Sequence, residues 1–471
     1  MRTSPQPPDQ HRAMDEKEAA MESFRFASLG KIAPAGFALA LFAPALLASP
    51  PASPVPFRQI DVRNVEQLYR AVNSAADCGG ARGCRLRIHL APGTYVLSPR
   101  SPAGPFRPNH GALRLRPGVS LVGSERHVDT DGDGVPDPID PENPDVFAVP
   151  GTETTIDGSQ LELLGEPRVD CAGETRSFPD PVIYIGRNNK VSSLSLIPGQ
   201  HVGIGEPTDD RVDPNGSLSI EITDVVLNGV LTFANSECAA RRARSVLSLS
   251  HSVVRGGFVL VQNFYTGDAN DDPSGGPEIR ATVAFNLFYD NAGAALHATG
   301  GDEGTDGGSV TLHTLGNVFR NNGANLQLRG SVGRDGLRTV GNRLVVTSES
   351  DTFGESPASV LILGGTGDAV ENVVRAEFFD TRFIRDSPDT SSEITIIGGD
   401  ADASDDHASV LITGATVETS DGVSVEGGLS IVDETGSGEV PSTARLLGSR
   451  NRFLVVNQGL PAPEDHFFIN H

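Results

Sequence analysis

The sequence predicts an all-β protein, a single-stranded parallel β-helix in which the chain coils around one axis and an N-terminal helix caps the first coil. Two observations support this prediction. Short apolar strands recur along the chain without helical crossovers between them, and an asparagine-centred pattern repeats at about the length of one coil. Repeats of this kind are typical of a solenoid rather than of a globular sandwich.

The first residues predict a secretory signal peptide. A flank that contains basic residues ends at Lys31, and the apolar run 37–48 follows before a pair of prolines. The run is short for a membrane span, which takes about 20 residues. We therefore expect residues 1–48 to be the signal peptide region and residues 49–471 to form a single β-helix domain. The mature protein is then secreted or held at the cell surface.

The four cysteines fit an oxidising compartment. Cys78 and Cys84 enclose a small Gly-rich loop, and Cys171 and Cys238 remain to form a second pair. A zinc site is the alternative, but these spacings do not match one. We expect two disulfides.

The formal net charge of −24 opposes binding to nucleic acid and to anionic lipid, because both are negatively charged. No segment after residue 48 is apolar enough to cross a bilayer, so we expect no membrane insertion of the mature chain. Tryptophan is absent and tyrosine is scarce, which argues mildly against a dedicated sugar-stacking module.

One amphipathic helix is expected at about residues 64–76. Asn64 can cap its N-terminus, and Gln67 stands three residues further on, as in a capping box. Its apolar side chains share one face: Val65, Leu68, Val72 and Ala76. Because a solenoid has an open apolar end, we expect this helix to cover the first coil.

The repeat is clearest at Asn286 and Asn317, each followed two residues later by a phenylalanine. Weaker copies follow at Asn342 and Asn372, and the four asparagines are separated by 31, 25 and 30 residues. We interpret them as one asparagine per coil of a three-sided β-helix. The amides then bond their copies in neighbouring coils, and the phenylalanines point inward and stack.

An acidic insertion at about residues 125–150 separates two strand-like segments and predicts a calcium site. The expected ligands are the carboxylates of Asp129, Asp131, Asp133, Asp137 and Asp140 and the carbonyl of Val135. The loop resembles the calcium loops of dockerin and thrombospondin type 3 repeats, although Asp140 stands where an EF-hand has a bidentate glutamate. We expect calcium to stiffen this loop rather than to catalyse. The alternative is an acidic surface loop without an ion.

Several segments carry a resemblance to a known superfamily. They are Val65–Val72, Leu90–Tyr95, Gly118–Gly123, Ile156–Gly158 and Lys190–Leu196, together with the Asn-x-Phe repeats. From about Phe57 to about Gln458 the chain resembles the pectate-lyase-like, right-handed parallel β-helix superfamily. The resemblance implies right-handed coils and a polysaccharide ligand. It fixes no activity, since that superfamily includes lyases, hydrolases, epimerases and adhesins.

A candidate site lies on the strands that follow the asparagine repeats. When Ala294–Thr299 and Ala324–Arg329 are aligned on their inward leucines, His297 lies over Gln327 on the outer face. Arg329 lies two residues further along the same face. The resemblance implies that an extended polysaccharide binds in such a groove. If the protein is a lyase, His297 or Arg329 abstracts the proton beside a uronate carboxylate; the alternative is that these are ordinary solvated residues.

Activity motifs of the superfamily are mostly missing. The pectate-lyase branch has a tryptophan-containing motif that a chain without tryptophan cannot have, and the Asp pairs lack the Gly-His-Gly of the hydrolase branch. The sequence therefore leaves two classes of function open. One is a secreted protein that binds or acts on a polysaccharide, expected to be acidic, with lyase or glycoside hydrolase activity. The other is a noncatalytic surface or envelope scaffold or adhesin.

Overall fold

A computed structural model describes most of the chain after residue 56. The described ranges are 57–74, 85–124, 154–162, 168–169, 175–176, 180–206, 217–235, 243–263, 276–302, 304–333, 338–354, 356, 359–385, 394–397, 406–419, 428–432, 443–449, 454–455 and 467–470. The signal peptide predicted at residues 1–48 lies outside them. No helix within these ranges combines the length and the apolar character that a membrane span requires.

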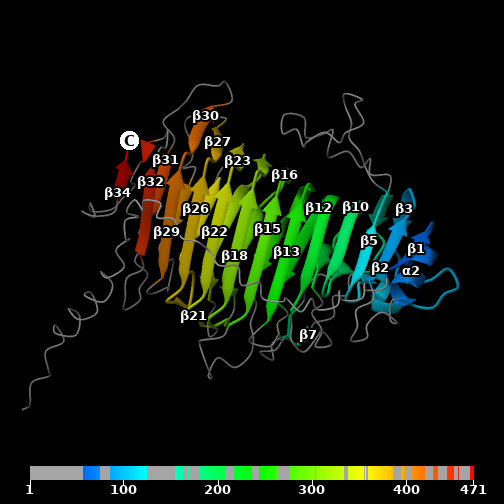
Figure 1. Ribbon diagram of the computed structural model, residues 1–471. Helices are drawn as coiled ribbons and strands as arrows, with labels where there is room; N and C mark the ends of the chain where they lie inside the picture. The colour runs from blue at the N-terminus through cyan, green and yellow to red at the C-terminus, as the bar shows by residue number, and fades with distance from the viewer. Residues whose placement is uncertain are drawn as a thin grey trace, which may run out of the picture. The chain divides into compact units, whose positions relative to one another are not determined.

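The strands stack in three ladders, because each coil adds a segment to each ladder (Figure 1). The first ladder contains β1 (Phe57–Val62), β2 (Arg85–Leu90), β5 (Val119–Val122), β10 (Asn189–Ile197), β12 (Ser219–Ala234), β13 (Arg244–Ser250), β15 (Glu278–Ala284), β18 (Ser309–Leu315), β22 (Arg343–Glu349), β26 (Val373–Phe379), β29 (His407–Thr413), β32 (Thr443–Ser449) and β34 (Phe467–Asn470).

The second and third ladders share the long strands β10, β12 and β14 (Val253–Gln262) with their neighbours. The second contains, besides parts of these three, β3 (Gly93–Val96), β6 (Thr154–Asp157), β16 (Leu287–Tyr289), β19 (Val318–Arg320), β23 (Thr352–Gly354), β27 (Arg382–Arg385) and β30 (Thr416–Thr419). The third contains β4 (Leu113–Arg114), β9 (Pro181–Tyr184), β11 (Val202–Gly205), parts of β12 and β14, β17 (Ala294–Asp302), β20 (Ala324–Val332), β24 (Val360–Leu363), β28 (Ile394–Ile397), β31 (Gly428–Val432) and β33 (Leu454–Val455).

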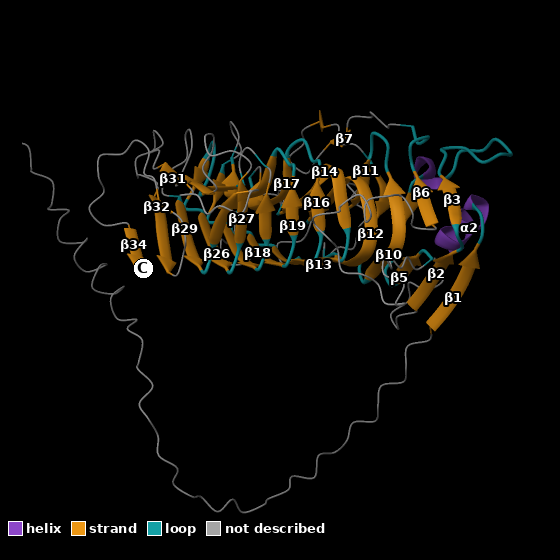
Figure 2. Cartoon of the chain, turned by 90° about the horizontal axis from the view of Figure 1, so that it is seen from above, coloured by secondary structure: helices purple, strands orange, loops and turns teal. Residues whose placement is uncertain are grey.

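All pairings within these ladders are parallel, which confirms the predicted right-handed parallel β-helix. Two short pairs lie outside the ladders: β21 (Thr339–Val340) with β25 (Ala369–Val370), and the antiparallel β7 (Arg168–Val169) with β8 (Thr175–Arg176). Figure 2 shows how little helix accompanies the strands. The described helices are α2 (Val65–Ser74) and the 3-10 turn η2 (Pro108–Gly111).

Phenylalanines of the second ladder stack along the inside of the coil, as predicted. The centroid of the Phe319 ring lies 4.7 Å from that of Phe288 and 5.0 Å from that of Phe353, which in turn lies 5.3 Å from Phe383. All four rings are at most 1% exposed. Each such stack contributes about 0.5–1.5 kcal/mol beyond the burial of its area.

The asparagines form ladders at several corners of the coil, which corrects the single ladder predicted. Between the first and second strand ladders, Oδ1 of Asn317 accepts from the backbone N–H and the side chain of Asn286, at 3.0 and 2.9 Å. Asp351 continues this column and accepts in the same way from Asn317, at 2.7 and 2.9 Å. Between the second and third strand ladders, Asn322 accepts in this way from Asn291, at 3.2 and 2.8 Å.

Asn342 and Asn372 lie at the remaining corner, between the third and first strand ladders. Asn372 accepts from the backbone and side chain of Asn342 at 2.9 and 3.1 Å, and Asp406 accepts likewise from Asn372 at 2.8 and 2.9 Å. The step of 25 residues from Asn317 to Asn342 therefore leads from one corner to another. Within this column the coil lengths are 30 and 34 residues.

Helix α2 packs on the first strands, as predicted, and contacts β1, β2 and β4. Asn64 caps it, since its Oδ1 accepts the backbone N–H of Gln67 at 3.0 Å. Oε1 of Gln67 accepts from the backbone N–H of Arg63 at 2.7 Å. Leu68 and Val72 are buried beneath the helix.

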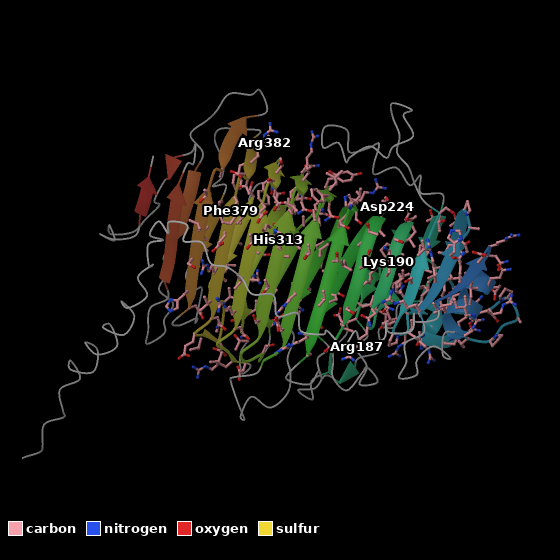
Figure 3. All side chains as sticks on the ribbon, viewed as in Figure 1. Arg187, Lys190, Asp224, His313, Phe379 and Arg382 are labelled. Atoms are coloured by element: carbon pink, nitrogen blue, oxygen red, sulfur yellow. The ribbon has the colours of Figure 1, made fainter. Side chains whose placement is uncertain are left out.

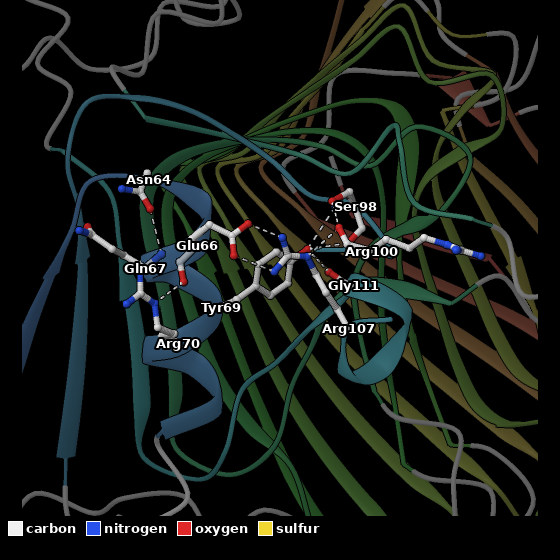
Figure 4. Close-up of polar contacts among 9 residues, drawn as sticks. All are labelled: Asn64, Glu66, Gln67, Tyr69, Arg70, Ser98, Arg100, Arg107 and Gly111. Carbon is white, nitrogen blue, oxygen red and sulfur yellow. Dashed lines mark hydrogen bonds and ion pairs between the residues drawn. The ribbon is translucent and has the colours of Figure 1, made fainter. Parts of the chain in front are cut away.

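A buried arginine holds α2 against the loop that contains η2 (Figure 4). The side chain of Arg107 is 7% exposed and forms an ion pair with Glu66, with Nη1 at 3.2 Å from Oε2. Its guanidinium lies over the ring of Tyr69, 3.9 Å from the centroid. The Tyr69 hydroxyl donates to the carbonyl of Gly111 at 2.6 Å. The cap is thus attached by specific polar contacts as well as by its apolar face.

We expect Phe319→Ala to lower the free energy of unfolding by about 3–5 kcal/mol, because it removes a buried ring from the middle of the stack. Chemical denaturation measures this loss. The matched control is Phe285→Ala: that ring is 46% exposed, so its removal should cost about 1 kcal/mol or less. Equal losses for the two variants would contradict the stack.

A second expectation concerns Asp351, which is fully buried. Burial raises the pKa of this carboxyl, against hydrogen bonds from Ser348, Thr314 and Asn317 that lower it. Since the folded pKa exceeds the ordinary value of 3.8, stability falls as the pH rises through the folded pKa. The Asp351→Asn side chain can donate to the same hydroxyls and does not titrate. The melting temperature of this variant relative to that of the wild type should therefore be higher at pH 8 than at pH 4. A constant difference over that range argues against a raised pKa.

Candidate functional site

The outer face of the third ladder carries polar side chains in two neighbouring rows, which we call the third-ladder face. One row reads Tyr184, Gly205, Thr232, Leu260, His297, Gln327 and Leu361. The row two residues further along reads Ala234, Gln262, Thr299, Arg329 and Leu363. Parallel pairing brings these side chains together from residues that are far apart in sequence.

The structure has the alignment that the sequence predicted. Leu296 pairs with Leu326, and both are completely buried. His297 therefore pairs with Gln327 on the outer face, and Arg329 follows two residues later. The geometry brings the three predicted residues together, while their catalytic roles stay a prediction.

His297 is largely withdrawn from water on this face. Its Nε2 lies 3.2 Å from Oγ1 of Thr299. Burial, and to a lesser extent the positive charge of Arg329, lower the pKa of His297 from 6.5 to about 4. The imidazole is therefore neutral near pH 7, and one ring nitrogen can accept a proton while the other donates.

Arg329 places a permanent positive charge beside this neutral histidine. With the Gln327 amide oriented to face the guanidinium, its oxygen accepts from Nη2 and Nε of Arg329 at 2.6 and 3.3 Å. This contact fixes the direction of the guanidinium. A fixed planar fork of N–H donors matches a carboxylate in geometry and charge.

Glu206 belongs to the same face, and the sequence analysis missed it. It directly follows β11, and its Oε2 accepts from the Thr232 hydroxyl at 3.1 Å and from the backbone N–H of Ala234 at 3.3 Å. Burial raises the pKa of Glu206 above its ordinary value of 4.5. The available signal was a carboxylate after an apolar strand, but its partners lie 26 and 28 residues away in sequence.

The third-ladder face thus holds two titratable groups whose pKa values shift in opposite directions. Burial raises the pKa of Glu206, whereas it lowers that of His297 to about 4 and so keeps His297 neutral and able to accept a proton. Glu206 contacts β12, and His297 lies two strands further along the ladder, which corresponds to roughly 10 Å. Environments that separate pKa values in this way are typical of acid and base groups in enzymes.

The outer face of the first ladder also carries exposed pairs of titratable side chains; Figure 3 labels one member of two of these pairs, Lys190 and His313. Nζ of Lys190 lies 2.5 Å from the Glu221 carboxylate, and Nε2 of His313 lies 3.6 Å from that of Glu349. Exposed pairs of this kind contribute at most about 1 kcal/mol and are common on solvated surfaces. We therefore place the candidate site on the third-ladder face.

The predicted calcium ligands and disulfides lie outside the described residues. This applies to Asp129, Asp131, Asp133, Val135, Asp137 and Asp140, and to Cys78, Cys84, Cys171 and Cys238. Both sets stay predictions. Among the residues that the structure does describe, no three His, Cys, Asp or Glu side chains are grouped so as to hold a metal ion.

Solved structures similar to this chain include two enzyme modules and an adhesin. The A-module of mannuronan C-5 epimerase AlgE4 from Azotobacter vinelandii matches 87% of this chain over 100% of its own, with a TM-score of 0.40 and 14% identity. The A-module of AlgE6 from the same organism matches 85% over 97%, with a TM-score of 0.33 and 10% identity. PfbA, a surface adhesin of Streptococcus pneumoniae, matches 84% over 89%, with a TM-score of 0.31 and 11% identity.

No family model and no curated protein matches the sequence. Similarity at these identities transfers neither an activity nor a ligand to this chain.

The lowered pKa of His297 makes a prediction about acid stability. Because the folded pKa is about 4 and the ordinary value is 6.5, the unfolded chain takes up the proton first, and stability is lost as the pH falls from 6.5 towards 4. Between pH 7 and pH 4 the wild type should lose roughly 3 kcal/mol more stability than His297→Gln. Denaturation of both proteins at each pH measures this difference. Parallel curves for the wild type and His297→Gln would refute the shift.

Proposed function

We propose that this chain binds an extended acidic polysaccharide across the third-ladder face and cleaves it as a polysaccharide lyase. The observation that carries the proposal is the pairing, on adjacent strands of one face, of a neutral histidine with an oriented guanidinium. A β-helix also suits a polymer. Its neighbouring strands lie about 4.8 Å apart, so that successive coils can contact successive sugar units.

Arg329 binds the carboxylate of a uronate unit in the proposed reaction. The guanidinium stabilises the negative charge that develops when the proton beside the carboxylate is removed. His297 accepts that proton, since its lowered pKa keeps it neutral at the pH of the reaction. The electron pair forms the new double bond as the glycosidic C–O bond breaks, and the leaving oxygen takes a proton from water.

Glu206 has a separate place in this proposal. In the proposed elimination His297 takes the proton from the sugar and water supplies the proton for the leaving oxygen, so Glu206, at roughly 10 Å from His297, takes no part in that step. Its carboxyl, held by Thr232 and Ala234, forms a hydrogen bond with a neighbouring sugar unit. Its contribution is to binding and alignment of the polymer.

One observation favours glycoside hydrolysis as the second candidate. A carboxyl with a raised pKa and a neutral histidine are separated here by a distance close to the range of about 6.5–9.5 Å that leaves room for a water molecule in inverting glycosidases. Glu206 would then protonate the glycosidic oxygen and His297 would activate the water. A hydrolase releases reducing ends without forming a double bond, so the products distinguish the two reactions.

We expect the purified mature protein to release unsaturated products from an acidic polysaccharide such as polygalacturonate or alginate, measured by their ultraviolet absorbance with calcium and then with chelator. His297→Gln should lower kcat at least about 100-fold, and Arg329→Gln should raise KM and lower kcat. Activity of the wild type should fall as the pH drops towards 4, where His297 is protonated.

The matched control is His313→Gln on the first-ladder face, which should retain wild-type kcat. New reducing ends without absorbance would replace the lyase by the hydrolase. Binding to the polymer without any cleavage would instead indicate a noncatalytic scaffold or adhesin.

A further inference from the structure

The outer face of the second ladder holds an arginine that is paired with neutral side chains. Arg255, on β14, donates from Nη1 to the Tyr289 hydroxyl at 2.9 Å and from Nε to Oδ1 of Asn228. Asn228, Arg255 and Tyr289 occupy equivalent outward positions in successive coils, and Arg320 follows in the next coil. The parallel register therefore builds this cluster from strands β12, β14, β16 and β19.

Several other basic side chains of the described residues have carboxylate partners. Arg107 pairs with Glu66, and Arg280 with Glu278, at 2.6 Å in the second case. Among the described residues no carboxylate lies within ion-pair distance of Arg255. The chain has 61 acidic and 37 basic residues, so a shortage of acidic side chains does not account for this.

The surroundings make this positive charge costly without an anion. Arg255 is only partly exposed. Beside it lies a small apolar cluster: Val226, Val253, Leu287 and Val318, which surround the Tyr289 ring. A charge that is partly withdrawn from water and lacks a counter-charge is unfavourable, and an anionic ligand relieves that penalty.

The guanidinium is also oriented for a ligand. Asn228 and Tyr289 use two of the five N–H donors of Arg255. These contacts hold the side chain in one direction and leave further donors for a planar acceptor. An arginine held in this way loses little conformational freedom when a carboxylate binds.

We propose that Arg255, positioned by Asn228 and Tyr289, is a second anion-binding site and that it takes the carboxylate of an acidic sugar unit. The planar fork of N–H donors on Arg255 matches the two oxygens of a carboxylate in geometry and charge. The proposal shares the ligand class with the proposed function, but it concerns a different ladder and different residues.

The Arg255 site also lies next to the corner that leads to the third-ladder face. Tyr289 ends β16, and the chain then turns through Asp290 and Asn291 into β17, which carries His297. The second anion-binding site and the third-ladder face therefore flank one corner. A polymer that crosses this corner contacts both.

Calorimetric titration with a galacturonate oligomer tests the proposal, with a neutral galactose oligomer of the same length and inorganic phosphate as comparison ligands. Arg255→Gln should weaken binding of the galacturonate oligomer about tenfold or more and reduce its salt dependence. Tyr289→Phe, which keeps the ring and removes only the hydroxyl contact, should weaken it by a smaller factor. Arg280→Gln, which alters an exposed, ion-paired arginine on the first ladder, is the matched control and should bind as the wild type does.

Unchanged affinity in both Arg255→Gln and a correctly folded Tyr289→Phe overturns the proposal. Phosphate that binds with equal affinity, and with the same dependence on Arg255, overturns its assignment to an acidic sugar. The outcome is separable from that of the proposed function, because His297→Gln should abolish turnover and still bind the oligomer at Arg255. Conversely, Arg255→Gln should retain turnover at saturating substrate.

Discussion

The buried polar groups at the corners of the coil are the constraint on which the structure depends. At each corner the backbone leaves the strand ladders, so its N–H and C=O groups lose their strand partners while they remain away from water. Asn286 shows the solution: its Nδ2 donates to the carbonyl of Leu249 in the preceding coil and to Asn317 in the next coil. Each amide thus satisfies a backbone carbonyl of one coil and bonds to the asparagine of another, which fixes the coils relative to each other.

These corners set the register of the strands, and the register sets the function of each face. A slip of one residue would exchange the inner and outer faces of a strand. Leu296 would then point outward, and His297 would enter the core. The Phe288–Phe383 stack opposes such a slip, because an outward turn of any ring would break the column. The same contacts that stabilise the solenoid therefore hold His297 and Arg329 on adjacent strands.

The arrangement of charge differs between the three outer faces. The first ladder carries exposed ion pairs, such as Lys190 with Glu221, and these are screened by water. The third carries titratable groups whose pKa values burial shifts in opposite directions: it raises the pKa of Glu206 and lowers that of His297. The second carries Arg255 between neutral partners. In an acidic protein, a ligand can alter the electrostatic balance at a cation with neutral partners, such as Arg255, and at buried titratable groups.

The sequence by itself determined the fold class, the capping helix, the inward phenylalanine stack and the alignment of His297 with Gln327. Each of these follows from local patterns: alternation along a strand, a cap at Asn64, and a repeat about one coil long.

The tertiary structure alone decided which corner each asparagine occupies, because every corner presents the same unpaired backbone groups and the loop lengths between corners vary. It also decided the partners of Glu206 and Arg255, which lie 26 to 34 residues away along the chain. Such contacts depend on the register between coils, and no pattern within a single strand contains that register.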